Sequence, residues 1–274
     1  MHNDVSKLNR DGWNQHAYSA WVNANGSPEQ LAQKLMKDPH RKLEPFRPYL
    51  KELKGLRVAN LLGSNGKMAI SLALLGADVT VVDISEDNAR YARATAAAAG
   101  VQLDYLVMDV MEFPVQEYAG VFDLVIMELG ILHWIMDLRK FFGIVAAVLK
   151  NGGRVIVRDY HPFKKKVLQW KDGQMIAGGN YFDDSVRSGI VPYAEFLGEE
   201  ERKTLTEIRY RPWTMGEIIT SAADSGLMIR ALHEESGPIQ RWVFPEEAPE
   251  GIEYRLPGIY TLVADKAPIC DELL

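Results

Sequence analysis

The chain has 274 residues, of which 47% are hydrophobic and 25% charged, and its formal net charge is −6. These proportions are typical of a soluble globular protein with a sizeable core, and the negative charge disfavours large nucleic-acid substrates, whose binders usually carry a basic patch. The single cysteine, Cys270, excludes an internal disulfide and a cysteine-based metal site.

Residues 1–56 precede the first predicted strand, and we interpret them as an N-terminal helical cap. The polar N-terminus lacks the apolar segment of a signal peptide, and the longest apolar run, Phe141 to Leu149, is too short to span a bilayer. We therefore expect a cytoplasmic protein without a membrane segment. Trp13, Tyr18 and Trp21 lie in a short predicted helix and give it an aromatic face.

The next stretch predicts a strand from Arg57 to Leu62, a glycine turn from Gly63 to Gly66, a helix from Lys67 to Leu75 and a strand from Asp78 to Ile84 that carries Asp83 near its end. Continuous apolar strands are typical of a parallel sheet covered on both faces. A glycine turn before a helix brings backbone N–H groups close to a ligand, and an acid after the next strand suits the hydroxyls of a ribose. The stretch predicts a site for a nucleoside-containing cofactor.

Two nucleotide motifs fit this turn poorly. A P-loop is excluded because Gly63 and Gly66 are too close, and because Met68 follows Lys67 where a hydroxyl should stand. A dinucleotide fingerprint needs G-x-G-x-x-G, which Leu62 to Gly66 does not provide, so NAD or FAD remains a weaker alternative.

Further strands and helices alternate along the chain. Ser85 is a predicted N-cap of a helix that ends at Gly100, and the run from Leu103 to Val110 predicts a third strand ending in Asp109. A fourth strand lies within Val121 to Trp134. This alternation predicts right-handed crossovers and a doubly wound parallel sheet.

The fifth strand is predicted from Arg154 to Tyr160, after a helix over 138–149 and a turn at Asn151 to Gly153. The glycine turn, Asp83, Asp109 and Glu128 all fall at the carboxyl ends of predicted strands. Ligands of open α/β sheets bind at these ends. Because these residues converge at one edge of the sheet, the sequence predicts a single ligand site. This prediction needs no comparison with a known family.

The pattern changes after the fifth strand. Residues 161–212 show no clear strand–helix alternation, and we interpret them as an inserted substrate lid. Its lysine run, Lys164 to Lys166, could bind an anionic substrate, although a solvated surface is the favoured interpretation. Residues 213–274 then predict a helix from Thr214 to Ser225 and two closing strands, Leu227 to Glu235 and Ile259 to Lys266, joined by a long loop.

Four motifs in this order resemble those of the class I S-adenosylmethionine-dependent methyltransferases. They are the Arg57 to Ser85 stretch (motif I, usually V-L-D-x-G-x-G-x-G), LDYLVMDV, VFDLVIMELGILHW and LKNGGRVIVRDYHP, the last similar to L-K-P-G-G. The resemblance implies an α/β fold with a doubly wound, seven-stranded, mostly parallel sheet of order 3-2-1-4-5-7-6. It also implies an N-terminal helical lid and a cofactor-binding core over 57–160.

This sequence departs from motif I at three positions. Asn60 stands where the family often has an acid, and it can still contact the methionine amino group of the cofactor. Leu62 and Ser64 stand at the first two glycine positions, and Gly66 fits the last.

The resemblance implies that Asp83 holds the ribose, and that the Asp109 carboxylate and the Val110 N–H bind the adenine. The implied cofactor is S-adenosyl-L-methionine, with S-adenosyl-L-homocysteine as product. An aromatic residue of the lid, Tyr18, completes the implied set, which comprises Asn60, Leu62, Gly63, Ser64, Asn65, Gly66, Asp83, Ile84, Asp109, Val110, Glu128, Leu129 and Tyr18.

The predicted reaction is in-line methyl transfer to an O, N, C or S atom of a small-molecule acceptor. Where the acceptor must lose a proton, a general base is needed, and the candidates at the strand ends are His133, Asp159 and His161. His161 is the first choice because it precedes Pro162 at the entrance of the lid. No metal-ligand spacing is present, so we expect a metal-independent mechanism.

Three alternatives stay open at this point. An RNA or protein methyltransferase would need a basic groove, and a non-catalytic S-adenosylmethionine-binding protein would fit the altered motif I. An oxidoreductase on a Rossmann-like sheet would bind NADH instead. The acceptor and the oligomeric state are also open.

Overall fold

A seven-stranded sheet forms the centre of the computed structural model, which describes residues 2–267 and so leaves Cys270 outside the described residues. The strand order is β10-β11-β5-β4-β1-β2-β3, which confirms the predicted order read from the opposite edge. The strands from β1 to β5 run parallel, and β11 lies antiparallel to both β5 and β10. Their bounds are Arg57–Leu61 (β1), Asp78–Asp83 (β2), Asp104–Val107 (β3), Phe122–Glu128 (β4), Leu149–Tyr160 (β5), Leu227–Glu234 (β10) and Ile259–Lys266 (β11).

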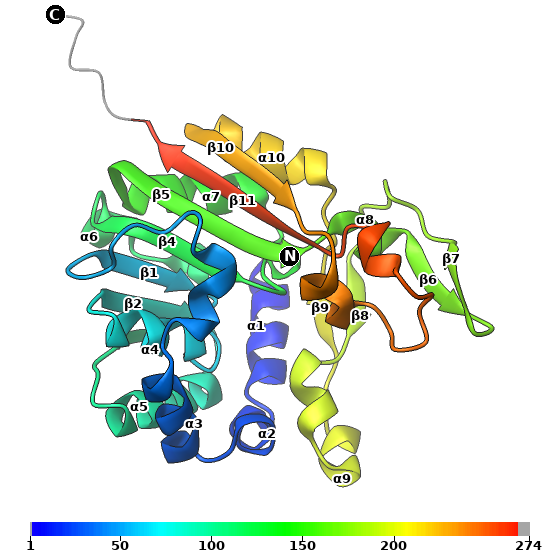
Figure 1. Ribbon diagram of the computed structural model, residues 1–274, viewed down its shortest axis with the longest axis horizontal. Helices are drawn as coiled ribbons and strands as arrows, with labels where there is room; N and C mark the ends of the chain where they lie inside the picture. Colours follow the sequence, from blue (N-terminus) through cyan, green and yellow to red (C-terminus); the bar gives the residue numbers. More distant parts are fainter. Residues whose placement is uncertain (1, 268–274) are drawn as a thin grey trace, which may run out of the picture.

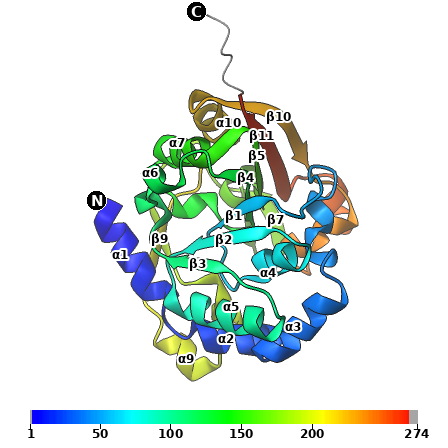
Figure 2. The ribbon, with the colours of Figure 1, turned by 90° about the vertical axis from the view of Figure 1, so that its left-hand side faces the viewer.

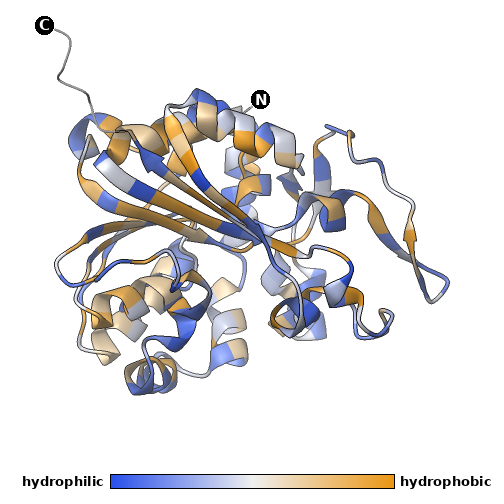
Figure 3. Ribbon diagram, turned by 45° about the horizontal axis from the view of Figure 1, so that its top comes forward, coloured by the Kyte–Doolittle hydropathy of each residue, from blue (hydrophilic) through white to orange (hydrophobic). Residues whose placement is uncertain are grey.

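Helices cover both faces of the sheet (Figures 1 and 2). Alternate residues of a strand point to opposite faces, so Val58 joins one core cluster with α4 and α5, and Ala59 joins the other with α7 and α10. Hydrophobic residues accordingly run along the central strands in Figure 3. The covering helices are Lys67–Leu74 (α4), Glu86–Ala98 (α5), Val115–Tyr118 (α6), Leu138–Val148 (α7) and Met215–Asp224 (α10).

Two predicted N-caps are present. The Ser85 hydroxyl accepts from the Asn88 N–H at 3.2 Å at the start of α5. Thr214 and Glu217 form the reciprocal capping box that begins α10. These local signals place helix starts correctly because they satisfy N–H groups that no helical carbonyl can reach.

Two strands differ from their predicted bounds. β5 begins at Leu149 rather than Arg154, because the Asn151 to Gly153 turn is an irregularity inside the strand, where its pairing with β4 shifts. β3 ends at Val107, and Asp109 instead caps the short 3-10 helix η2 (Val110–Glu112).

The N-terminal segment contains three helices where the sequence predicted one. They are α1 (His2–Trp13), α2 (Ala17–Asn25) and α3 (Pro28–Lys37), followed by the 3-10 helix η1 (Arg41–Phe46). α1 lies against β9, and a Cβ on Gly12 would overlap the Ile208 side chain, so glycine permits this close approach.

The segment after β5 is more regular than predicted. It contains α8 (Pro162–Lys166), a hairpin of β6 (Leu168–Lys171) and β7 (Gln174–Ala177), a second pair of β8 (Arg187–Gly189) and β9 (Ile208–Tyr210), and the helices η4 (Pro192–Phe196) and α9 (Glu199–Lys203). The β6–β7 hairpin projects from the body of the molecule in Figure 1. The remaining 3-10 helices are η3 (Leu132–Trp134), η5 (Pro238–Val243) and η6 (Ile252–Tyr254). No helix among the described residues is long and apolar enough to cross a bilayer.

Candidate active site

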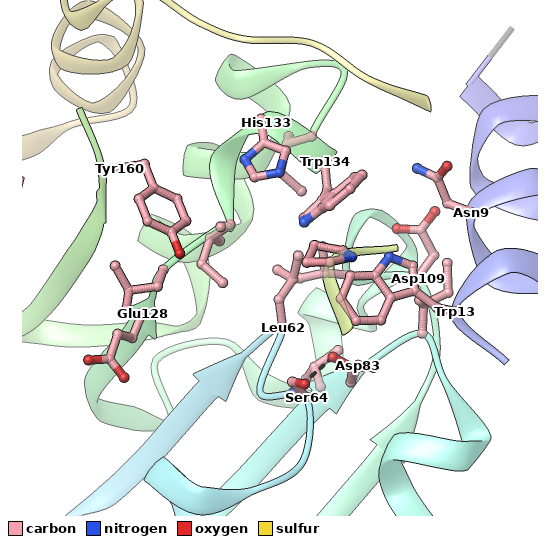
Figure 4. Close-up of a pocket in the computed structure, with 18 of the residues that line it drawn as sticks. Asn9, Trp13, Leu62, Ser64, Asp83, Asp109, Glu128, His133, Trp134 and Tyr160 are labelled. Carbon is pink, nitrogen blue, oxygen red and sulfur yellow. Dashed lines mark hydrogen bonds between the residues drawn. The ribbon is translucent and has the colours of Figure 1, made fainter. Parts of the chain in front are cut away.

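A cavity of about 550 Å³ lies at the carboxyl ends of the parallel strands, and its volume is in the usual range for ligand pockets (Figure 4). The sheet forms its floor, and residues of α1, of the inserted segment and of the β10–β11 connection complete its walls. The predicted cofactor-binding residues that line it are Leu62, Ser64, Asp83, Ile84, Asp109, Val110, Glu128 and Leu129.

The turn after β1 has an unusual backbone. Leu62 and Ser64 adopt positive φ angles of 50° and 48°. These two positions match glycines in motif I, and the left-handed backbone supplies the physical reason, because glycine reaches such angles without steric cost. The turn is held by the Asp83 carboxylate, which accepts from the Ser64 N–H at 2.9 Å, and by the Tyr105 hydroxyl, which donates to the Ser64 carbonyl at 2.6 Å.

Four other residues of the predicted cofactor set do not line the cavity: Asn60 belongs to β1, and Gly63, Asn65 and Gly66 belong to the turn that follows it. The Asn60 amide donates to the Ile126 carbonyl at 3.1 Å. Its Oδ1 is buried without a hydrogen-bond partner among the described residues, and a Cβ on Gly63 would approach it to 2.7 Å. A side chain at Gly63 would therefore close the space between the turn and the sheet.

Asp83 lies at the end of β2 and is only 8% exposed. Its Oδ1 accepts from the Ser85 N–H and the Asn88 amide, each at 3.0 Å. Burial raises the pKa of this carboxyl, and the hydrogen bonds from Asn88 and from backbone N–H groups oppose the rise. The side chain is thus held rigidly at the cavity wall with its orientation set by neighbouring donors.

Asp109 follows the end of β3 and caps η2. Its Oδ1 accepts from the Met111 N–H at 2.9 Å, and its Oδ2 accepts from the hydroxyl of Ser6 in α1. Val110 follows it in the cavity wall. The first helix therefore contacts the carboxylate expected at the adenine, and it covers this end of the cavity.

Glu128, at the end of β4, belongs to a charged network. The Arg158 guanidinium is 2% exposed and lies 3.3 Å from the Glu128 carboxylate, while it binds Glu235 through two atoms at 2.6 and 2.8 Å. Lys42 forms an ion pair with the other Glu128 oxygen. Basic groups on two sides thus hold Glu128 at the cavity wall.

Asp159, a predicted catalytic residue, does not line this cavity and supports the loop after β4. Its two oxygens accept from four backbone N–H groups at 2.6 to 3.1 Å, three of them in the loop and one its chain neighbour: Gly130, Ile131, Leu132 and Tyr160. This arrangement makes Asp159 a positioning residue for the loop that carries His133.

His133 does line the cavity, although it is only 9% exposed. Burial lowers its pKa well below the usual range, and the charge of Lys165 lowers it further. Its ring and that of Tyr160 converge on Gly130, since a Cβ there would lie 3.6 Å from His133 Cε1 and 3.7 Å from Tyr160 Cε2. His133 is the one candidate base of the sequence prediction that the fold brings to the cavity.

His161, the first choice for the base, points elsewhere. Its Nδ1 accepts from the Phe163 N–H at 3.1 Å and so caps α8, and its Nε2 lies 2.7 Å from the Glu234 carboxylate. It does not line the cavity. Side chains alternate along a strand, so Tyr160 faces the cavity while its neighbours Asp159 and His161 do not.

Tyr18 also lies outside the cavity lining. Its ring packs edge to face on Tyr91, with centroids 5.6 Å apart, and the Arg90 guanidinium lies 4.4 Å from its ring centre. The two tryptophans of the same segment, Trp13 and Trp21, line the cavity instead.

Sequence reasoning missed most of the wall opposite the cofactor residues. Tyr160 ends β5, Trp134 lies in η3, and Trp242 comes from the β10–β11 connection. Lys164, Lys165 and Glu195 of the inserted segment line the same region. Only the lysine run gave a signal, and it was interpreted as solvated surface.

Comparison with known proteins shows which families the chain resembles. Residues 61–157 match the family described as "Methyltransferase domain". This part of the chain therefore resembles a methyltransferase domain, and the whole fold is similar to that of solved S-adenosylmethionine-dependent methyltransferases.

Individual relatives cover different parts of the chain. A ubiquinone biosynthesis O-methyltransferase of Xanthomonas euvesicatoria is 32% identical over 106 residues, which are 39% of this chain and 44% of that protein, so the chain spans less than half of this relative. A crystal structure of an S-adenosylmethionine-dependent methyltransferase from Mesorhizobium loti has a TM-score of 0.62 at 22% identity, covering 82% of this chain and 97% of that one. Magnesium protoporphyrin IX methyltransferase from Synechocystis, solved with bound S-adenosylhomocysteine, has a TM-score of 0.57 at 16% identity and covers 96% and 100%.

Proposed function

We propose that this protein is an S-adenosylmethionine-dependent methyltransferase that acts on a small-molecule acceptor. The observation that carries the proposal is a single cavity. One part of it holds the acids Asp83 and Asp109, and the other part, which we call the chamber, is lined by Trp13, Trp134, Tyr160 and Trp242 beneath α1 and the inserted segment. The relatives named above support it, because they include an O-methyltransferase and a structure with bound S-adenosylhomocysteine.

The residues present fit an adenosyl cofactor. Asp83 would accept from the ribose hydroxyls, and Asp109 with the Val110 N–H would bind the adenine edge. Apolar neighbours, among them Ile84 and Met108, would pack on the base. The Glu128 carboxylate also lines the cavity, where the ammonium group of the cofactor's methionine part would find an acceptor.

The cofactor supplies a methyl group that its sulfonium already activates, so the protein contributes mainly placement. Holding the two reactants in line and excluding water is worth roughly 7–11 kcal/mol of the barrier. Trp13, Trp134 and Tyr160 supply apolar walls for this purpose. His133 is the group best placed to take a proton from an acceptor, because it is the one of the three candidate bases that lines the cavity.

A calorimetric titration with S-adenosylhomocysteine tests the proposal, with S-adenosylmethionine in parallel and NADH as the control nucleotide. We expect micromolar affinity for both adenosyl ligands and no NADH binding. Binding of NADH alone would favour an oxidoreductase instead. A protein that binds S-adenosylmethionine yet methylates nothing in a broad acceptor panel would fit a non-catalytic binding protein.

A small acceptor agrees better with the cavity than RNA or a protein does. The inserted segment contributes Pro192 and Glu195 to the walls, and α1 covers the other side. The net charge of −6 also gives no general attraction for a polyanion.

A further inference from the structure

Two lysines of α8 line the chamber end of the cavity. Lys164 and Lys165 are both half-buried, and their ammonium groups lie 5.7 and 5.1 Å from the centre of the Tyr160 ring. Because Tyr160 itself lines the cavity, both ammonium groups lie near an aromatic ring of the cavity wall. The third lysine of the run has a different role, since the Lys166 ammonium donates to the carbonyls of Asp183 and Pro212 at 2.5 and 2.9 Å.

Neither cavity lysine forms a salt bridge within the part of the chain that the structure describes, although the Asp159 carboxylate acts on Lys165. Exposed lysines elsewhere pair with carboxylates, as Lys203 does with Glu199 and Glu200. Burial lowers the pKa of both Lys164 and Lys165; the charge of Lys165 lowers that of Lys164 further, and the Asp159 carboxylate opposes the shift of Lys165 only in part. Two cations held in a partly closed aromatic chamber suit a ligand that brings its own negative charge.

We propose that Lys164 and Lys165 bind an anionic group of the methyl acceptor, so that the acceptor is an organic acid with a flat or apolar body. The inference rests on the proposed function, because it assumes that the cofactor fills the Asp83 and Asp109 end of the same cavity. Tyr160, Trp134 and Trp242 supply the aromatic wall against which such a body packs.

Glu195 is the opposing charge in this region. It lines the same cavity, and the carboxylates of Asp159, Glu195 and Glu128 all add to the rise in the pKa of the Tyr160 hydroxyl to about 12, which burial mainly causes. Glu128 is paired with Lys42 and Arg158, so Glu195 is the lining carboxylate near Tyr160 that forms no ion pair among the described residues. Removing the Glu195 charge should strengthen anion binding, so this residue tests the proposal in the opposite direction.

Matched probes that differ only in charge test the proposal. Naphthalene-2-carboxylate and naphthalene-2-carboxamide have nearly the same shape, and benzoate with benzamide and hexanoate with hexanamide extend the series. Each is titrated into protein saturated with S-adenosylhomocysteine. We expect at least one carboxylate to bind at least about tenfold more tightly than its amide, as a charge-assisted hydrogen bond allows.

Variants assign this preference to the lysines. The double variant Lys164→Gln/Lys165→Gln should bind carboxylates and amides equally while its affinity for S-adenosylhomocysteine stays the same. Lys171→Gln removes the same charge from the exposed β6 strand and should change nothing. Glu195→Gln should tighten carboxylate binding about two- to fivefold.

Three results would overturn the assignment: amides that bind as tightly as carboxylates, a preference that survives in the double variant, or a panel in which no carboxylate binds. A separate outcome is that the unaltered protein does not bind S-adenosylhomocysteine. This result would refute the proposed function instead. In that case the same probes, titrated into the protein without cofactor, still decide whether the lysine pair binds anions.

Discussion

Asp83 is the residue on which cofactor binding should depend most. Its carboxylate is held by three donors, the N–H groups of Ser64 and Ser85 and the amide of Asn88, and it lies at the wall of the cavity. A rigid, buried acceptor suits two vicinal hydroxyls, because its orientation needs no reorganisation when a ligand binds.

We expect Asp83→Ala to weaken S-adenosylhomocysteine binding by about 10- to 100-fold, since hydrogen bonds to a charged group are worth about 1.5–3 kcal/mol. Calorimetry measures the affinity, and a melting curve checks that the variant is folded. Asp78→Ala, at the exposed start of the same strand, serves as the control. Unchanged affinity in Asp83→Ala would remove the ribose assignment.

Ser64 shows strain that a single substitution can relieve. Its φ of 48° costs a residue with a Cβ about 1–2 kcal/mol. Ser64→Gly should therefore raise the free energy of unfolding by about 0.5–1 kcal/mol after the entropy of glycine is counted. Ser64→Ala keeps the Cβ and should show no gain. Urea denaturation distinguishes the two, and a destabilised glycine variant would contradict the strain argument.

At the level of elements, the loop after β4 depends on Asp159. One carboxylate joins β5 to three consecutive N–H groups of this loop, so the position of His133 follows from a residue that does not face the cavity. This dependence explains how a buried acid at a strand end can matter for activity without touching a substrate.

Asp159→Asn presents an amide to several N–H donors, and we expect it to lower the free energy of unfolding by about 2–4 kcal/mol. Asp137→Asn is the matched control, because asparagine caps a helix as well as aspartate does and Asp137 only caps α7. Urea denaturation provides the measurement. Equal stability of the two variants would show that the four hydrogen bonds contribute little.

For the whole molecule, buried histidines make the free energy of unfolding depend on pH. Burial holds the pKa of His133 well below 6.5 in the folded state, and the pKa of His161 is shifted in the same direction. The unfolded chain therefore binds protons that the folded protein does not, and stability falls as the pH drops below about 6.5.

His133→Gln should flatten this dependence between about pH 5 and about pH 8, leaving the part due to His161. The free energy of unfolding in urea, compared at both pH values, measures the effect. The exposed His40→Gln variant should retain the slope of the unaltered protein. A slope that His133→Gln leaves unchanged would mean that the buried imidazole takes up its proton without cost.

Much of the fold followed from local patterns in the chain. Apolar runs separated by amphipathic helices predict a parallel sheet, and the carboxyl ends of parallel strands share one edge, so Asp83, Asp109 and Glu128 had to lie near one another. The glycine turn and the caps at Ser85 and Thr214 are equally local, because they satisfy backbone groups within a few residues.

The opposite wall depended on tertiary structure. Tyr160, Lys165 and Trp242 meet because the inserted segment and the β10–β11 connection fold back over the strand ends, and no local pattern encodes that path. The alternation of side chains along β5 was predictable from the sequence. We nevertheless selected Asp159 and His161 by residue type, and not Tyr160 between them. The local sequence thus determined the sheet and the acids near the strand ends, whereas long-range packing alone decided which side chains form the opposite wall of the cavity.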